Sequence, residues 1–151
     1  MPEYHLAQLN IGRMLAPMDS PTMAGFVARL DDINAMADSA PGFVWRLQDE
    51  AGNATALRPY EDEWIIINMS VWESVAALKA FTYSTEHAGV MRGRRQWFEP
   101  HTEMYFVMWW IPAGHIPTPQ EARERLDYLQ ANGETPYAFT FRTVFEPQAQ
   151  R

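Results

Sequence analysis

The sequence predicts an α+β domain in which an antiparallel sheet of the ferredoxin-like, split βαβ order carries its helices on one face. Three observations predict this fold. Segments of alternating polarity are separated by segments of helical periodicity. Proline and glycine clusters divide the chain into short elements. These elements follow the order β-α-β-β-α-β, with one further helix and strand appended.

Length and composition predict a single domain over residues 1–151. Hydrophobic residues make up 47% of the chain, which is sufficient for one packed core. Aromatic residues make up 13%, so some rings are expected to line a pocket or a subunit interface instead of the core.

The first half of the chain contains two predicted strands and one predicted helix. Residues 4–11 alternate as a strand does. Residues 20–40 are predicted to be a helix, with Ser20 as N-cap and Pro21 at the first helical position. Pro41 and Gly42 end it. Residues 43–48 then alternate as a strand, with Phe43, Trp45 and Leu47 on one face.

The strand predicted for residues 64–72, WIIINMSVW, has three consecutive isoleucines and apolar side chains on both faces. It is therefore expected at the centre of the sheet. Residues 73–82 and 85–98 are predicted to be two helices, with a break between them.

The last third of the chain begins with a predicted strand at residues 104–112, which has aromatic side chains on both faces. The segment from Thr118 to Gly133 is the clearest helix. Thr118 caps it, Pro119 comes first and Glu121 completes a capping box, while Gly133 ends it. Residues 138–145 alternate as a last strand.

The apolar residues on both sides of the two central strands require a cover on each face of the sheet. Helices cover one face in the predicted fold. A second copy of the chain is the economical cover for the other, so we expect a homodimer.

Charge and composition exclude several classes of protein. The formal net charge of −7 argues against a nucleic-acid partner. The chain has no cysteine, which excludes disulfides and thiolate metal sites. Its four histidines show no metal-binding spacing, so no metal is expected. No signal peptide or membrane span is expected either, which makes the cytoplasm the default location.

Several segments carry a family resemblance. The run INMSVWESVAALKAF, followed by YSTEHAGVMRGRRQWF, resembles the middle of proteins in the dimeric α/β-barrel superfamily. The whole chain resembles the bacterial family catalogued as domain of unknown function 3291, which carries no established activity. The matching pieces also include LAQLNIGRMLAPMDSPTMAGFVARLDDINAMAD, PGFVWRLQ and MWWIPAGHIPT.

The resemblance implies a homodimeric α/β barrel with a pocket between the sheet and the helices of each subunit. The wider superfamily includes antibiotic-biosynthesis and haem-degrading monooxygenases. In such monooxygenases Asn, Trp and His side chains surround the substrate. The substrate or a bound haem does most of the oxygen chemistry.

Only some of the site residues of those relatives have matching residues in this sequence. Asn10 matches an asparagine of the first strand, and Trp72 matches the tryptophan before the helix that follows the third strand. His87 falls near the second histidine of the antibiotic-type pattern. Phe81 stands where relatives carry His or Trp, and Met91 falls near the haem-ligand position. These departures argue against haem degradation. A monooxygenase reaction without a cofactor remains open.

The stretch STEHAGVMRGRRQWF, residues 84–98, is a candidate for a ligand-binding helix. On a helix, His87, Met91, Arg95 and Phe98 share one face. One interpretation is that His87 and Arg95 face a cavity, where Arg95 holds an anionic or phenolic group. His87, with an ordinary pKa of roughly 6.5, would then be the general base. The other is that His87 is structural and the arginines are solvated.

Asn10 and Asn68 occupy strand positions where asparagine is disfavoured. They are either pocket anchors, joined by Ser70, or partners of loop backbone at the end of the sheet. Trp45 and Trp72 are candidate pocket walls, although core and interface packing is the simplest role for every tryptophan here.

Three functions remain open from the sequence. The first is a cofactor-independent monooxygenase-like enzyme acting on an aromatic or polyketide-like compound. The second is a non-catalytic or stress-response protein that binds a small hydrophobic or aromatic ligand. The third is a scaffold whose pocket is filled by its own side chains. In the first two, the ligand-binding residues would be Asn10, Trp45, Asn68, Trp72 and Arg95, with His87 catalytic in the first.

Overall fold

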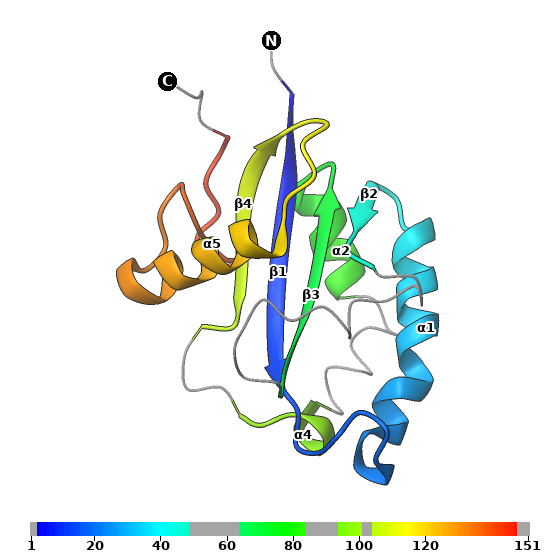
Figure 1. Ribbon diagram of the computed structural model, residues 1–151. Coiled ribbons are helices and arrows are strands. Elements are labelled where there is room, and N and C mark those ends of the chain that lie inside the picture. Colours follow the sequence, from blue (N-terminus) through cyan, green and yellow to red (C-terminus); the bar gives the residue numbers. More distant parts are fainter. Residues whose placement is uncertain (1–2, 49–63, 84–93, 101–103, 148–151) are drawn as a thin grey trace.

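The computed structural model describes residues 3–48, 64–83, 94–100 and 104–147 (Figure 1). Its strands are β1 (Tyr4–Arg13), β2 (Phe43–Arg46), β3 (Ile65–Trp72) and β4 (Phe106–Pro112). Its helices are the 3-10 turn η1 (Pro21–Met23), α1 (Ala24–Ser39), α2 (Val75–Thr82), α4 (Arg94–Trp97) and α5 (Pro119–Asn132).

The four strands form one antiparallel sheet in the order β2-β3-β1-β4. β1 and β2 thus run parallel to each other with β3 inserted between them, and β4 flanks β1. This arrangement is the split βαβ, and the predicted α+β, ferredoxin-like fold is confirmed. None of the described helices is long and apolar enough to cross a membrane.

Helix ends follow the capping chemistry that the sequence predicts. The Thr118 hydroxyl accepts a hydrogen bond of 3.0 Å from Glu121 N at the start of α5. The Glu121 carboxylate has a different role from the one expected in a capping box, because it accepts from Trp109 Nε1 at 3.0 Å and contacts His115 Nε2 at 2.8 Å. These contacts connect the N-terminus of α5 to Trp109 of β4.

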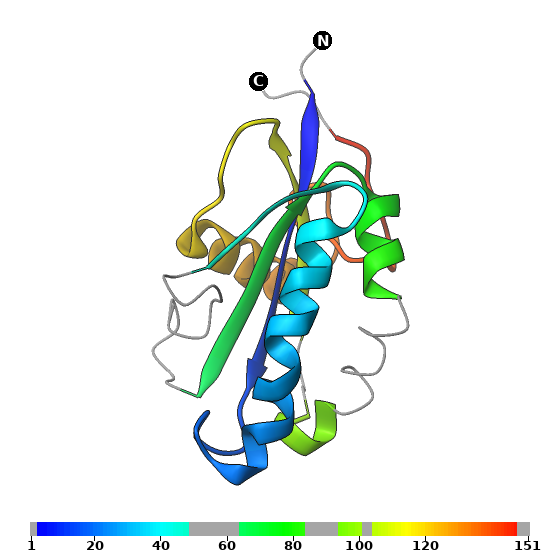
Figure 2. The same ribbon diagram turned by 90° about the vertical axis from the view of Figure 1, so that its right-hand side faces the viewer.

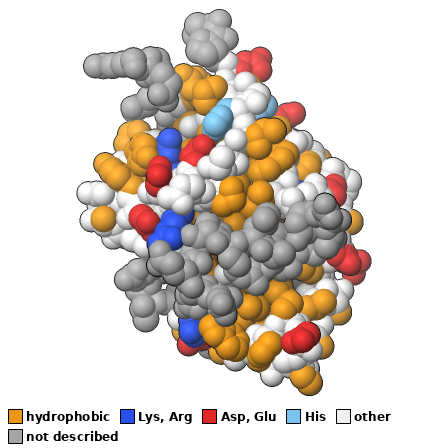
Figure 3. Space-filling view, in the orientation of Figure 1, with side chains coloured by type: hydrophobic (Ala, Val, Ile, Leu, Met, Phe, Trp, Pro, Cys, Tyr) orange, Lys and Arg blue, Asp and Glu red, His pale blue; other side chains and the backbone are white. Residues whose placement is uncertain are grey.

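Helices lie on both faces of the sheet, whereas the sequence predicts them on one face only. α2 packs against the face that carries Leu6, Trp72 and Met108, whereas α5 packs against the opposite face (Figure 2). The appended helix α5 therefore covers part of the face for which a second copy of the chain was expected. On the side that carries α5, hydrophobic side chains still form patches at the surface (Figure 3).

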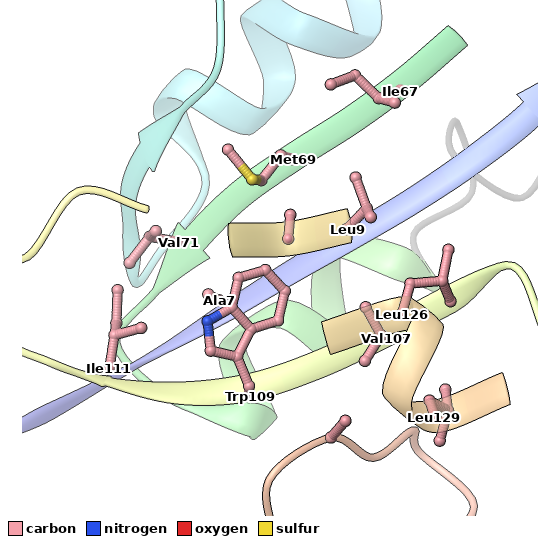
Figure 4. Packing of buried hydrophobic residues seen from close by; sticks show 12 residues of the cluster. Ala7, Leu9, Ile67, Met69, Val71, Val107, Trp109, Ile111, Leu126 and Leu129 are labelled. Carbon is pink, nitrogen blue, oxygen red and sulfur yellow. The ribbon is translucent and has the colours of Figure 1, made fainter. Parts of the chain in front are cut away.

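The α5 side holds the larger core cluster, in which Trp109 lies between strand residues and the apolar side of α5 (Figure 4). Leu126 and Leu129 of α5 are buried against it. The remaining buried members are Ala7, Leu9, Ile67, Met69, Val71, Val107, Ile111, Ala122 and Ala138. This cluster anchors α5 to the sheet, and a second cluster that includes Leu6, Trp72 and Met108 lies on the opposite face.

The strand over residues 43–48 differs from the prediction in which side chains share a face. Phe43 pairs with Trp72 but Trp45 pairs with Val71, so β2 has one extra residue at this point. Such a β-bulge reverses the alternation, because successive side chains otherwise alternate between faces. Phe43 consequently packs with α2, whereas Trp45 packs against the cluster on the α5 side.

The strand predicted for residues 138–145 is wrong. Phe139 exchanges two backbone hydrogen bonds with Met108 on the free edge of β4, at 2.7 and 3.0 Å, and the ladder stops there. The Glu134 carboxylate accepts from the backbone N–H and hydroxyl of Thr140, which holds the chain in a turn. The alternating phenylalanines Phe139, Phe141 and Phe145 instead pack into the cluster on the α2 side.

Candidate functional site

A cavity of about 340 Å³ lies on the face of the sheet opposite α5. Its floor is formed by β1 and β3, and α1, α2 and α4 contribute to its walls. Cavities of this size hold small organic ligands. The described lining residues that matter below are Gln8, Asn10, Asn68, Ser70, Trp72, Arg29, Leu30, Arg46, Phe81, Trp97, Phe98, Phe106 and Phe141.

The floor of the cavity is polar because four polar residues face each other across two strands. Gln8 pairs with Ser70 and Asn10 pairs with Asn68 in the antiparallel register. Residues two apart on a strand point to the same side, so all four side chains meet on one face. We call this set, Gln8, Asn10, Asn68 and Ser70, the amide floor.

Hydrogen bonds connect the amide floor into one network. Gln8 Nε2 donates to Asn68 Oδ1 at 2.9 Å and to Ser70 Oγ at 2.7 Å. Asn10 Nδ2 donates to Gln8 Oε1 and to Asn68 Oδ1, both at 3.2 Å. Trp72 Nε1 donates to Ser70 Oγ at 2.8 Å. The network orients the four side chains and gives the buried Gln8 amide and Ser70 oxygen hydrogen-bond partners.

Aromatic rings form the walls above this floor. Trp72 and Phe81 stack with centroids 5.2 Å apart, and Phe106 stacks on Phe141 at 5.3 Å. At the other end Phe98 lies directly on β1, where a Cβ at Gly12 would come within 2.7 Å of its ring. Only glycine permits this close approach, so Gly12 fixes the end wall. The cavity therefore suits a flat, apolar ligand.

The charged groups of the described lining residues are two arginines, and none of these residues is Asp or Glu. Arg46 Nε donates to Asp38 Oδ1 at 2.7 Å. The guanidinium of Arg29 lies 5.9 Å from the ring centroid of Trp97, a cation–π arrangement. Within the described ranges no group of three or more His, Cys, Asp or Glu residues could hold a metal ion.

The structure brings three of the sequence-predicted site residues together. Asn10, Asn68 and Trp72 all line the cavity. The structure does not bring Trp45 there, because the bulge in β2 directs it to the opposite face. His87 lies outside the described residues. Arg95 belongs to α4, and its side chain lies outside what the structure describes.

Sequence reasoning missed Gln8 and Arg29 as cavity residues. Gln8 stands two positions before Asn10 in a strand whose other nearby residues are apolar, and it is 3% exposed. The spacing of two between polar residues on this strand was the available signal. Arg29 gave no such signal, since it is one of several polar residues on an exposed helix.

Comparisons with solved structures return proteins of low sequence identity. SnoaB, a cofactor-independent oxygenase from Streptomyces nogalater, is 13% identical, with a TM-score of 0.49 over 74% of this chain and 95% of that chain. A protein from Pseudomonas aeruginosa is 13% identical, with a TM-score of 0.48 over 78% and 99%. A dabb family protein with a ferredoxin-like fold from Mesorhizobium loti is 13% identical, with a TM-score of 0.44 over 77% and 99%.

No curated protein shows significant similarity to the chain. The family model for the domain of unknown function DUF3291 matches residues 5–151, which is nearly the whole sequence. This agrees with the resemblance seen in the segments around Trp72 and Phe98. The chain belongs to the DUF3291 family.

Proposed function

We propose that this protein is an enzyme that oxygenates an aromatic or polyketide-like compound without a cofactor. The observation that supports the proposal is the amide floor within an aromatic-walled cavity. Flat rings gain contacts from Phe81, which stacks on the buried ring of Trp72. Oxygen substituents on the same compound gain hydrogen bonds from fixed amide and hydroxyl groups below the rings.

The amide floor also suits the charge that such a reaction develops. A phenol or anthrone must lose a proton before it can give an electron to dioxygen. Fixed hydrogen-bond donors in a site of low polarity stabilise the resulting oxyanion without reorganising. Recombination then forms a C–O bond to a hydroperoxide, which loses water. The balance is R₂CH₂ + O₂ → R₂C=O + H₂O, so the substrate supplies all the electrons.

His87 is the proposed base, on the family resemblance and on its ordinary pKa near neutrality. The test is oxygen uptake by the purified protein with 1,8-dihydroxyanthrone and no added metal or flavin, corrected for the uncatalysed rate. We expect one O₂ consumed for each quinone formed, and loss of turnover in His87→Ala with folding unchanged. Equal turnover in that variant refutes the role of His87.

A non-catalytic ligand-binding protein is the second candidate. The observation that favours it is that the described lining residues include no His, Asp, Glu or Lys, and hence no ordinary general base. In that case 1,8-dihydroxyanthrone binds and Asn10→Ala weakens binding, but oxygen uptake never exceeds the uncatalysed rate.

We further propose that the protein is a cytoplasmic homodimer. The hydrophobic patches on the α5 side support this assembly, because large exposed apolar patches mark interaction sites (Figure 3). Native mass spectrometry of the purified protein tests it. A dimer is the expected mass, and a monomer at micromolar concentration contradicts the proposal.

A further inference from the structure

We propose that the ligand of the cavity is an aromatic anion, recognised by Arg29 together with the free hydrogen-bond donors of Asn68 and Ser70. This inference rests on the proposed binding of an aromatic compound and adds the charge of its oxygen group. Two independent observations carry it: the sign of the charge around the cavity, and the hydrogen atoms that the amide floor leaves unused.

The charged side chains of the described cavity lining are cationic, although the protein is acidic. The chain has 19 Asp and Glu against 12 Lys and Arg, yet the described lining residues include arginines and no carboxylate. Arg46 is paired with Asp38. Arg29 forms no ion pair with any residue in the described ranges, and its guanidinium lies beside Trp97 at the cavity wall. Arg29 can therefore form an ion pair with a bound anion.

The unused hydrogens of the amide floor also favour an anion. Both hydrogens of Gln8 Nε2 and both of Asn10 Nδ2 are already donated within the network. Asn68 Oδ1 receives two of these bonds, whereas Asn68 Nδ2 has no partner in the described part of the chain. Asn68 is exposed on β3, so its two amide hydrogens are accessible to a ligand.

Ser70 also has an unused hydrogen-bond donor. Its oxygen accepts from Gln8 Nε2 and from Trp72 Nε1, which uses both lone pairs. Its hydroxyl hydrogen has no partner among the described residues, although the side chain is only 6% exposed. A buried donor of this kind is costly unless a ligand accepts from it. Phenolate, enolate and carboxylate oxygens accept such bonds most strongly.

The experiment uses two dyes that share one ring system. 8-Anilinonaphthalene-1-sulfonate is anionic, and N-phenyl-1-naphthylamine is its neutral counterpart. Fluorescence titration gives Kd for both dyes with the wild type and with Arg29→Gln. We expect Arg29→Gln to weaken binding of the anionic dye by about tenfold, because a charge-assisted hydrogen bond is lost. The Kd of the neutral dye should not change.

Two control variants make the result specific. Arg123→Gln removes the same charge from α5, where Arg123 contacts Asp127, and should leave both Kd values unchanged. Leu30→Trp fills the cavity from α1 and should weaken both dyes. Circular dichroism confirms that each variant is folded.

The outcomes separate the two proposals. If both dyes bind in the cavity but Arg29→Gln changes their Kd values equally or not at all, the anion inference fails and aromatic binding stands. If neither dye binds, or if Leu30→Trp weakens neither, the cavity does not take aromatic compounds and both proposals fail.

Discussion

Trp72 Nε1 donates a 2.8 Å hydrogen bond to Ser70 Oγ, and both residues are buried on the same face of β3. Ser70 Oγ also accepts from Gln8 Nε2 on the neighbouring strand. One hydroxyl therefore joins the aromatic wall of the cavity to its amide floor, so the position of the Trp72 ring depends on Ser70.

Ser70→Ala is expected to destabilise the protein, because two buried donors lose their acceptor. The expected loss in the free energy of unfolding is about 1–3 kcal/mol, measured by urea denaturation. The same substitution in a Trp72→Phe background should cost less, since one of the two donors is then absent. An identical cost in both backgrounds would show that the Trp72–Ser70 hydrogen bond contributes nothing to stability.

Phe81→Leu should weaken ligand binding, whereas Trp45→Leu should not change it. Phe81 stacks on Trp72 in the cavity, whereas Trp45 packs on the other face of the sheet. We expect Phe81→Leu to raise the Kd of N-phenyl-1-naphthylamine by about 2- to 10-fold. Trp45→Leu should leave this Kd unchanged while lowering stability. A weaker Kd in Trp45→Leu alone would contradict the direction assigned to Trp45.

Gly42→Ala is expected to destabilise the protein more than Gly114→Ala. Both glycines have positive φ, at 81° and 94°. A Cβ at Gly42 would lie 2.4 Å from Ala77 Cβ, but a Cβ at Gly114 would meet nothing within 4 Å. Gly114→Ala, the control variant, should therefore lose only about 1–2 kcal/mol, from backbone strain at a positive φ. Gly42→Ala should carry about 1–3 kcal/mol more from overpacking against α2. Thermal or urea unfolding measures the difference, and equal losses would refute the clash.

Glu134 is expected to make stability depend on pH in the acid range. Burial raises the pKa of Glu134, but hydrogen bonds from Thr140 and Thr143 outweigh it and hold the pKa below its ordinary value of 4.5. A carboxyl whose pKa is lower in the folded state stabilises the fold above the unfolded-state pKa. This stabilisation is lost as the pH falls through the folded-state pKa.

Urea unfolding of wild type and Glu134→Gln from neutral pH to about pH 3 checks this dependence. Glu134→Gln should be less stable than the wild type at neutral pH. The difference between their free energies of unfolding should become smaller below pH 4.5. Glu124→Gln, on the exposed side of α5, is the matched control. A difference between wild type and Glu134→Gln that stays constant over the whole range would contradict the prediction.

Much of the fold could be predicted because local chemistry specifies it. The isoleucines of β3 and the alternation of β1 favour strands whatever packs against them. Thr118 and Gly133 mark the ends of α5 through side-chain capping and a positive φ. Phe139, Phe141 and Phe145 fit the alternation of a strand, but only Phe139 pairs with β4. All three side chains pack into the cluster on the α2 side, so tertiary contacts decided the structure of this segment.

The sequence by itself predicted most of the elements, their order in a ferredoxin-like sheet, and a shared cavity for Asn10, Asn68 and Trp72. Only the tertiary structure decided that Gln8 joins them, since residues 8 and 70 meet through the antiparallel register of β1 and β3. It also decided that Trp45 leaves the site, because one extra residue in β2 reverses the face of every side chain after it. Local patterns specify which residues alternate, whereas pairing between distant segments specifies which of them meet.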